Sequence, residues 1–296
     1  MKKWEYKLTV SEINEETSLR EYLQKQLLIP KHLIFALRTN ERVLVNNKYI
    51  PMNFAIKNGD EIHLTFVEDD FSLPVQNLIP DNSVKPEILY EDTDLLVVNK
   101  PRGFKTHPNQ PGETNTLLNF CEAYLNQTNQ HAFMIHRLDQ FTSGAIIVGK
   151  NPAVVPILVR LIKDKVIYRN YLAWTDGIIN PASGTIEKAI GFDPEDKRKR
   201  KIDGGKPLQA KTDYMVQSTT NDHSLVELSL HTGRTHQLRV HLASIGHPIV
   251  GDPLYNPNSD NDEMLLHSWK LTLIRPYYMD QIEIKSPLPD SFKKFM

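Results

Sequence analysis

Cysteine is almost absent from this sequence of 296 residues, in which Cys121 is the only one. A single cysteine excludes an internal disulfide and a zinc site built from several thiolates. Long apolar runs are missing as well: the run from Ala145 to Val148 is typical, whereas a membrane-spanning helix needs roughly 20 apolar residues. The opening stretch, MKKWEYKLTV, is basic but lacks the apolar core of a signal peptide. We therefore expect a cytoplasmic enzyme that has no membrane partner.

The sequence also lacks two nucleotide-binding motifs and any strong excess of positive charge. It contains no glycine-rich phosphate loop and no GxGxxG after an expected strand, so chemistry with ATP or NAD is not expected and no cofactor is implied. Lys and Arg number 35 against 36 Asp and Glu, which gives a net charge of −1. This balance argues mildly against a large non-specific surface for nucleic acid, although a local basic patch can still bind one.

The composition is that of a globular protein with a sizeable core, and the length favours two domains. Residues 1–67 have the pattern of a small module. Helical spacing occurs at residues 19–23 and 31–38, and strand-like segments follow at residues 43–45, 48–50 and 61–66, with a turn at Asn46 and Asn47. Residues 68–86 contain three prolines and no clear period, which indicates a linker.

Residues 87–296 form the expected main domain. Strands are predicted at residues 95–100, 145–148, 168–174, 210–216 and 225–230. One helix is predicted to start at Asn151 and Pro152, with Asn as its cap, and another covers residues 234–245. Because strands outnumber helices and short loops join several of them, we predict an α+β fold. Its mixed, mainly antiparallel central sheet is flanked by helices and loops, and a small α/β module precedes it.

One carboxylate stands where a polar cluster runs into a buried strand. In the segment HRLDQFTSG, residues 136–144, Asp139 follows Arg137 and precedes the strand at residues 145–148. Asp139 is either a structural residue that caps the following turn or pairs with Arg137, or it is a nucleophile or general base. The residue types alone leave both readings open. A nearby cation keeps a carboxylate ionised, and an ionised, partly desolvated carboxylate suits covalent catalysis at a sugar carbon or an activated ring.

A second polar segment, HTGRTHQLRVHLASIGHP at residues 231–248, holds four histidines and two arginines. His236 and His241 are five residues apart, so they do not share a helix face as the paired ligands of a zinc enzyme do. A metal site is therefore not predicted. We interpret the segment as a helix start that faces an anion, with Arg234 and Thr235 directed into a cleft.

The charge run KRKRK at residues 197–201 has two interpretations. It is either a solvated loop, as charge runs usually are, or a mobile basic loop that contacts the phosphates of a nucleic acid.

These segments together resemble one family, the RluA/RluD-type pseudouridine synthases. HRLDQFTSG resembles the family signature, and HTGRTHQLRVHL at residues 231–242, GHPIVGDPLY at 246–255 and LLHSWKL at 265–271 resemble its later motifs. YRNYLA at residues 168–173 resembles the segment with the active-site tyrosine, which would be Tyr171, with Arg169 in place of the usual lysine. The resemblance covers nearly all of the main domain and implies the catalytic fold of that family.

Residues 1–67 resemble an S4 RNA-binding domain, which often precedes this catalytic domain. They depart from its pattern at Asn47, where glycine is usual, and at Pro30-Lys31, where a Ser-Arg pair is usual. The resemblance implies phosphate contacts from Lys31, Arg38, Arg42 and Lys48.

The resemblance implies the isomerisation of uridine to pseudouridine within RNA, by a monomer that uses no metal or cofactor. The expected substrate is ribosomal RNA, in particular that of the large ribosomal subunit, more than tRNA. Asp139 would attack C1′ of the ribose or C6 of the uracil, or act as a base at C2′, and these routes stay open. Arg234 would pair with Asp139, and Tyr171 would stack on the flipped uracil and serve in proton transfer. The expected RNA contacts are Arg137, which would fill the gap left by the flipped base, His136, which would mainly orient the loop, and Lys197, Arg198, Lys199 and Arg200.

Two alternatives from other classes stay open. One is a catalytically silent RNA-binding paralogue that acts in ribosome assembly. The other is a hydrolytic N-glycosidase that uses the same carboxylate and releases free uracil.

Overall fold

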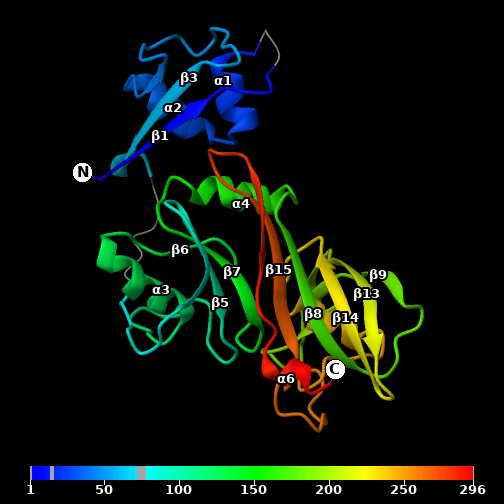
Figure 1. Cartoon of the computed structure of the whole chain (residues 1–296). Helices are drawn as coiled ribbons and strands as arrows, with labels where there is room; N and C mark the ends of the chain where they lie inside the picture. The colour runs from blue at the N-terminus through cyan, green and yellow to red at the C-terminus, as the bar shows by residue number, and fades with distance from the viewer. Residues whose placement is uncertain (1, 14–16, 72–77, 296) are drawn as a thin grey trace.

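The structure is a computed structural model that describes residues 2–13, 17–71 and 78–295. Its N-terminal module contains a small antiparallel sheet in the order β1-β3-β2, formed by β1 Lys3–Thr9, β2 Val43–Val45 and β3 Glu61–Val67. Helix α1 Leu19–Glu21, the π-helix η1 Tyr22–Gln26 and helix α2 Lys31–Thr39 pack beside this sheet, as Figure 1 shows.

Most of the local predictions for the module are confirmed. The turn at Asn46 and Asn47 is present, and both residues have the positive φ that asparagine tolerates, 49° and 62°. The predicted strand at residues 48–50 is wrong, because Lys48 forms only an isolated bridge with Val45. Strand β1 was not predicted, although Trp4, Tyr6 and Leu8 alternate with polar residues as in a half-buried strand.

The main domain is built around one mixed sheet. Among the described residues its order is β4-β5-β7-β15-β8-β14-β13-β9, with β6 paired to β7 and β16 paired to β15 (Figure 1). β15 runs parallel to β7, and the other pairs within this sheet are antiparallel. This arrangement confirms the predicted α+β class. The strands are β4 Glu87–Glu91, β5 Leu95–Lys100, β6 Phe133–Met134, β7 Ser143–Gly149, β8 Tyr168–Asp176, β9 Ser183–Glu187, β13 Lys211–Thr219, β14 His223–Leu230, β15 Leu266–Ile274 and β16 Gln281–Lys285.

Strands β5 and β7 are buried on both faces of the sheet. Val97 and Ile147 pack into a core shared with the N-terminal module and α4 Val155–Lys163, whereas Val98 and Ile146 pack into the core beneath α3 Leu117–Leu125 and α5 Gln237–Ala243. Successive side chains of a strand point to opposite faces, so a continuous apolar run is what two covered faces require. The remaining elements are η2 Glu68–Asp70, η3 Asn126–Thr128, α6 Asp290–Lys293 and a small sheet of β10 Ile190–Phe192, β11 Arg200–Ile202 and β12 Gly205–Leu208. No helix in the described ranges is both long and apolar enough to cross a membrane.

Two predicted helices begin later than the sequence suggested. The Asn151 side chain accepts the N–H groups of Ala153 and Val154, so it caps a preceding turn, and the helix itself starts at Val155. The helix predicted for residues 234–245 is α5, which starts only at Gln237 because His236 has a left-handed backbone, with φ 59°.

The N-terminal module packs directly on the main domain. The ring of Tyr6 in β1 stacks on Tyr277 with centroids 3.7 Å apart, and its hydroxyl donates to Asp94 at 2.8 Å. A second contact between the two parts is the hydrogen bond that Arg160 of α4 donates to the carbonyl of Gln24 in η1. Figure 1 accordingly shows α4 lying between the module and the sheet.

Candidate active site

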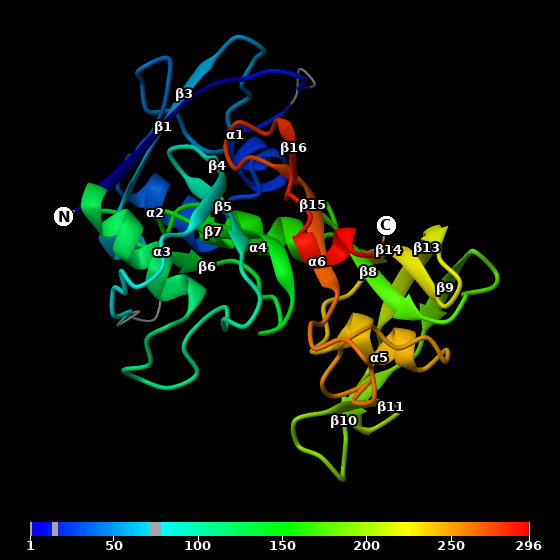
Figure 2. The ribbon, with the colours of Figure 1, turned by 60° about the horizontal axis from the view of Figure 1, so that its bottom comes forward.

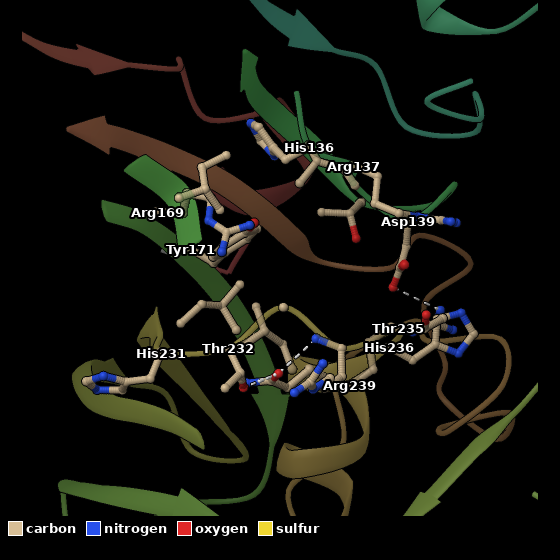
Figure 3. Close-up of a pocket in the computed structure, with 18 of the residues that line it drawn as sticks. His136, Arg137, Asp139, Arg169, Tyr171, His231, Thr232, Thr235, His236 and Arg239 are labelled. Carbon is tan, nitrogen blue, oxygen red and sulfur yellow. Dashed lines mark hydrogen bonds and ion pairs between the residues drawn. The ribbon is translucent and has the colours of Figure 1, made fainter. Parts of the chain in front are cut away.

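A cavity of about 490 Å³ brings together segments that are far apart in the sequence. The expected catalytic residues Asp139, Tyr171 and Arg234 all line it, and Figure 3 shows how the labelled side chains converge on it. Its walls come from the loop before β7, from β8 and from the segment that leads into α5. The lining residues include His136, Arg137, Asp139, Thr142, Lys163, Lys165, Arg169, Tyr171, His231, Thr232, Gly233, Arg234, Thr235, His236, Gln237 and Arg239.

The loop that carries Asp139 is fastened to the segment after β5. The Thr106 hydroxyl donates to the Leu138 carbonyl at 2.7 Å and accepts the Leu138 N–H at 3.1 Å. The Gly103 N–H donates to the carbonyl of Gln140 at 2.9 Å. The backbone on both sides of Asp139 is thus held by hydrogen bonds, while its own side chain keeps 19% exposure in the cavity. A carboxylate on such a loop is pre-positioned for a reacting group.

Lys100, at the end of β5, is buried beneath this loop. Its ammonium donates to the carbonyls of Pro101, Phe104 and Gln140 at 2.8–3.0 Å. Three acceptors match the three donors of a charged lysine. Burial lowers the pKa of Lys100 to about 7, while the charge of Asp139 acts in the opposite direction.

The arginine that faces Asp139 is Arg239 and not, as predicted, Arg234. A guanidinium nitrogen of Arg239 lies 3.6 Å from the Asp139 carboxylate, and the dashed line from Asp139 in Figure 3 marks this pair. Two further nitrogens donate to Asp252, each at 2.7 Å, and the Arg239 and Asp252 side chains are 2% and 0% exposed. Burial opposes the charge of Arg239, but the hydrogen bonds and the charge of Asp252 outweigh it and raise the pKa of Arg239.

The late start of α5 explains why Arg239, and not Arg234, faces Asp139. Arg239 lies in the first turn of the helix and is buried against the cavity floor, whereas Arg234 precedes the helix and is exposed at the rim, where it donates to the Gln209 carbonyl. In the sequence, the only indication for Arg239 is its position among the apolar residues of LRVHL. That position predicts that Arg239 is buried but does not predict which residue it pairs with.

Tyr171 lies in the middle of β8 and forms part of the cavity floor. It pairs with Leu228 of β14 on one side and Ser268 of β15 on the other, and its side chain is buried at 3% exposure. Burial raises the pKa of Tyr171, so the phenol is neutral near pH 7. Arg169 lines the cavity two residues earlier on the same strand.

His136 is buried, which corrects its expected contact with RNA. Its Nε2 accepts the backbone N–H of Ile147 at 3.0 Å, so it orients the loop relative to β7. Burial, reinforced by the charge of Arg169, lowers the pKa of His136 to about 3, and the ring is neutral. Arg137, by contrast, is exposed at the mouth of the cavity.

A tyrosine that the sequence analysis did not single out lies behind Arg239. The Arg239 guanidinium sits over the ring of Tyr255 at 5.0 Å from its centroid. The Tyr255 hydroxyl accepts the N–H of Arg200 at 2.7 Å and lies 2.9 Å from Nδ1 of His236. Because the Tyr255 oxygen accepts the N–H of Arg200, the Tyr255 O–H proton is free to be donated to Nδ1 of His236. Burial lowers the pKa of His236.

The other predicted RNA contacts lie in two separate places. Lys31 and Arg38 line a cavity of about 390 Å³ in the N-terminal module, together with Arg20 and Phe35, and Lys48 is exposed after the asparagine turn. The basic run lies on the small sheet beside α5, where β11 begins at Arg200, so the run is partly a strand and not wholly a loop. Of its side chains, Lys197 and Arg198 are exposed and Lys199 is half-buried, and Arg198 pairs with Asp196 at 2.7 Å.

Comparison with known proteins places this geometry in a family. The family model described as RNA pseudouridylate synthase matches residues 94–244, and the one described as RluD ribosomal pseudouridine synthase N-terminal domain matches residues 6–62. The protein named uncharacterized RNA pseudouridine synthase YhcT of Bacillus subtilis is 34% identical over 97% of this chain and 94% of its own length. The ribosomal large subunit pseudouridine synthase D of Neisseria meningitidis is 34% identical over 84% of this chain and 69% of its own.

Solved structures agree with these sequence matches. The structure of human RNA pseudouridylate synthase domain containing 1 superposes with a TM-score of 0.60 at 31% identity, over 71% of this chain and 86% of that one.

Proposed function

The chain belongs to the RNA pseudouridine synthase family, and from this membership we propose that it converts uridine to pseudouridine in ribosomal RNA with Asp139 as the nucleophile. The observation that carries the assignment is the Asp139 carboxylate, which is exposed to the cavity and faces the buried guanidinium of Arg239 at 3.6 Å.

The reaction exchanges one bond for another at the anomeric carbon. The bond from C1′ of the ribose to N1 of the uracil breaks, the uracil turns, a bond from C1′ to C5 forms, and the proton on C5 is lost as one is gained at N1. Asp139 attacks C1′ or C6, or removes a proton from C2′. The positive charge of Arg239 stabilises the ionised carboxylate that all three routes require.

Tyr171 and Arg137 supply the surroundings of the flipped uridine. A base reaches the buried floor of the cavity only after it leaves its stack, which costs a few kcal/mol and least in a loop. The neutral, buried ring of Tyr171 suits stacking on the uracil and proton transfer. Arg137, exposed at the mouth, is placed to fill the gap in the RNA.

The remaining basic residues would hold the rest of the RNA. We propose that residues 1–67 bind its backbone through Lys31, Arg38 and Lys48, and that Arg234 at the rim and Lys197 to Arg200 contact phosphates nearer the target. The preference for ribosomal RNA rests on relatives whose names state that target.

The decisive experiment compares pseudouridine maps of total RNA from cells with and without this protein, and then treats the identified RNA with purified protein. Asp139→Asn keeps the shape and removes the charge, and we expect it to abolish conversion. The matched control is Asp164→Asn, which replaces an exposed carboxylate at the end of α4 that pairs with Arg160 and does not line the cavity, and which should convert RNA at the normal rate. Normal conversion by Asp139→Asn would refute the assignment. An RNA that the wild-type chain binds but leaves unmodified would favour a silent paralogue, and released uracil would favour an N-glycosidase.

A further inference from the structure

The small sheet beside the active site carries an exposed aromatic side chain that the proposed chemistry does not use. Phe192, at the end of β10, is 53% exposed. Its partner across the β10–β11 pair is Arg200, whose guanidinium lies over the ring at 4.4 Å from the centroid. Aromatic rings and guanidinium planes are the two protein surfaces on which unpaired RNA bases stack.

Attraction between positive charge and phosphate does not by itself account for the features of the hairpin that joins β10 and β11. The basic run at residues 197–201 is accompanied by Asp193, Glu195 and Asp196, and Arg198 is already paired with Asp196. Attraction to phosphate is therefore moderate, and the distinctive feature is the planar pair at its base.

The planar pair is fixed relative to the catalytic cavity. The backbone N–H of Arg200 donates to Tyr255, the same tyrosine that contacts His236 and lies under Arg239. Ile190 and Ala210 pack against Val240 of α5, next to Arg239. Figure 2 shows β10 and β11 lying against α5, with their connecting hairpin projecting on the opposite side of the molecule from the N-terminal module.

Close packing inside the small sheet makes it rigid. A Cβ added to Gly191 would approach the backbone of Gly204 to 2.5 Å, and one added to Gly204 would approach the Phe192 carbonyl to 2.4 Å. Side chains at these positions would force the strands apart, so the glycines allow the chain to cross tightly beside Phe192.

We propose that Phe192 and Arg200 form a stacking site for an unpaired nucleotide of the substrate RNA, close to the target uridine and distinct from the cavity that holds the uracil. The proposal rests on the proposed function, because the RNA must first enter the neighbouring cavity. The occupant is RNA because the site continues the active-site rim through Tyr255 and His236, and because exposed lysines flank it. The site reads the presence of a base by its flat face and not by its edge, so it selects for an unpaired position and not for a particular sequence.

The test uses an RNA fragment that the wild-type protein converts. It also uses a series of variants of that fragment, each with one abasic site at a different position near the target uridine. Wild-type protein should bind one abasic RNA about 5- to 100-fold more weakly than the intact one, which corresponds to the stacking of one base. Phe192→Ala should bind intact RNA with a similar loss and should be insensitive to that abasic position. Its dependence on salt should not change, because no charge is removed.

A matched control is available at the other end of the main domain. Tyr278 is 51% exposed and lies under the guanidinium of Arg275 at 4.9 Å, in the turn between β15 and β16. Tyr278→Ala should keep the wild-type sensitivity to the abasic site. Arg200→Lys keeps the charge and the backbone N–H but loses the plane, so it should lose part of the affinity with an unchanged slope against salt.

The outcomes separate this proposal from the one on which it rests. If wild-type protein modifies no RNA, the proposed function fails. If wild-type protein modifies the fragment but Phe192→Ala, shown to be folded by its thermal unfolding, keeps the wild-type response to every abasic position, the stacking site is overturned. The same holds if Tyr278→Ala loses the response as Phe192→Ala does.

Discussion

Replacing Asp252 by Asn would test how Arg239, which faces the proposed nucleophile Asp139, is held. Asp252 accepts two hydrogen bonds from Arg239, each 2.7 Å long, and both side chains are almost fully buried. Asn keeps the volume and can still accept the N–H groups of Leu254 and Tyr255, which Asp252 accepts through one oxygen. The substitution therefore removes one buried charge and leaves the local turn in place.

The expected magnitude follows from burial. Removing one partner of a buried ion pair costs about 3–5 kcal/mol, because the other charge stays buried without compensation. Here Asp139 lies only 3.6 Å from the third nitrogen of Arg239 and supplies part of the missing attraction. We therefore expect a loss of about 3 kcal/mol in the free energy of unfolding, which lowers Tm by roughly 6–12 °C for a unit of this size. The guanidinium should also move towards Asp139, so the single-turnover rate should fall about tenfold or more.

The control is another bidentate pair of the same two residue types. Arg275 donates to Asp280 at 2.8 and 2.6 Å, but the Asp280 side chain is 48% exposed. Asp280→Asn should change the free energy of unfolding by less than about 1 kcal/mol. Thermal unfolding followed by circular dichroism and single-turnover conversion of RNA measure both effects. Equal Tm shifts for the two variants, or an unchanged rate in Asp252→Asn, would refute the assigned role of the buried pair.

Three further predictions concern the support of the Asp139 loop. The pKa of His136 is about 3 in the folded protein and about 6.5 in the unfolded chain. Between pH 6.5 and pH 3 the unfolded chain therefore binds one proton more than the folded protein, and the free energy of unfolding falls as the pH drops below about 6.5. His136→Gln should make that fall shallower in urea titrations at pH 6.5 and 4.5, by up to about 1.4 kcal/mol per pH unit. Thr106→Val leaves the buried N–H and carbonyl of Leu138 unpaired, so it should cost about 2 kcal/mol in chemical unfolding and slow conversion, and an unchanged rate would contradict the fastening. Gly144→Ala should cost about 3 kcal/mol or more and reduce the yield of folded protein, because Gly144 has φ 108° and an added Cβ would lie 2.3 Å from the Ser268 carbonyl.

Local apolar pattern was enough to predict the strands that hold the site. Strand β5 was predicted with its observed ends, and β7 was found around residues 145–148. Both are buried on two faces, so nearly every residue in them is apolar and the signal is strong. The carboxylate on the loop before β7 was found in the same way, by its contrast with the strand that follows.

The choice between two arginines could not be made from local pattern. It depends on where α5 begins, because a helix that started at residue 234 would place Arg234 in its first turn, and the observed start at Gln237 places Arg239 there instead. That start is set by the left-handed backbone of His236, whose ring is held by Tyr255 in a segment 19 residues away. It also depends on Asp252, which fixes the buried guanidinium. Both partners lie outside the segment, so only the folded chain brings them to it.

The buried charges around Asp139 hold the geometry of the site and add little net stability. Lys100, Arg239 and Asp252 are each buried to 2% exposure or less, and taking such groups out of water opposes folding unless each is fully bonded. Each is bonded here: Lys100 to three carbonyls of the loop region, and Arg239 to Asp252. The result is a carboxylate whose backbone and counter-charge are both fixed before RNA arrives. Under the proposed function, binding energy from the RNA can then be used to flip the uridine, because none of it is needed to position Asp139.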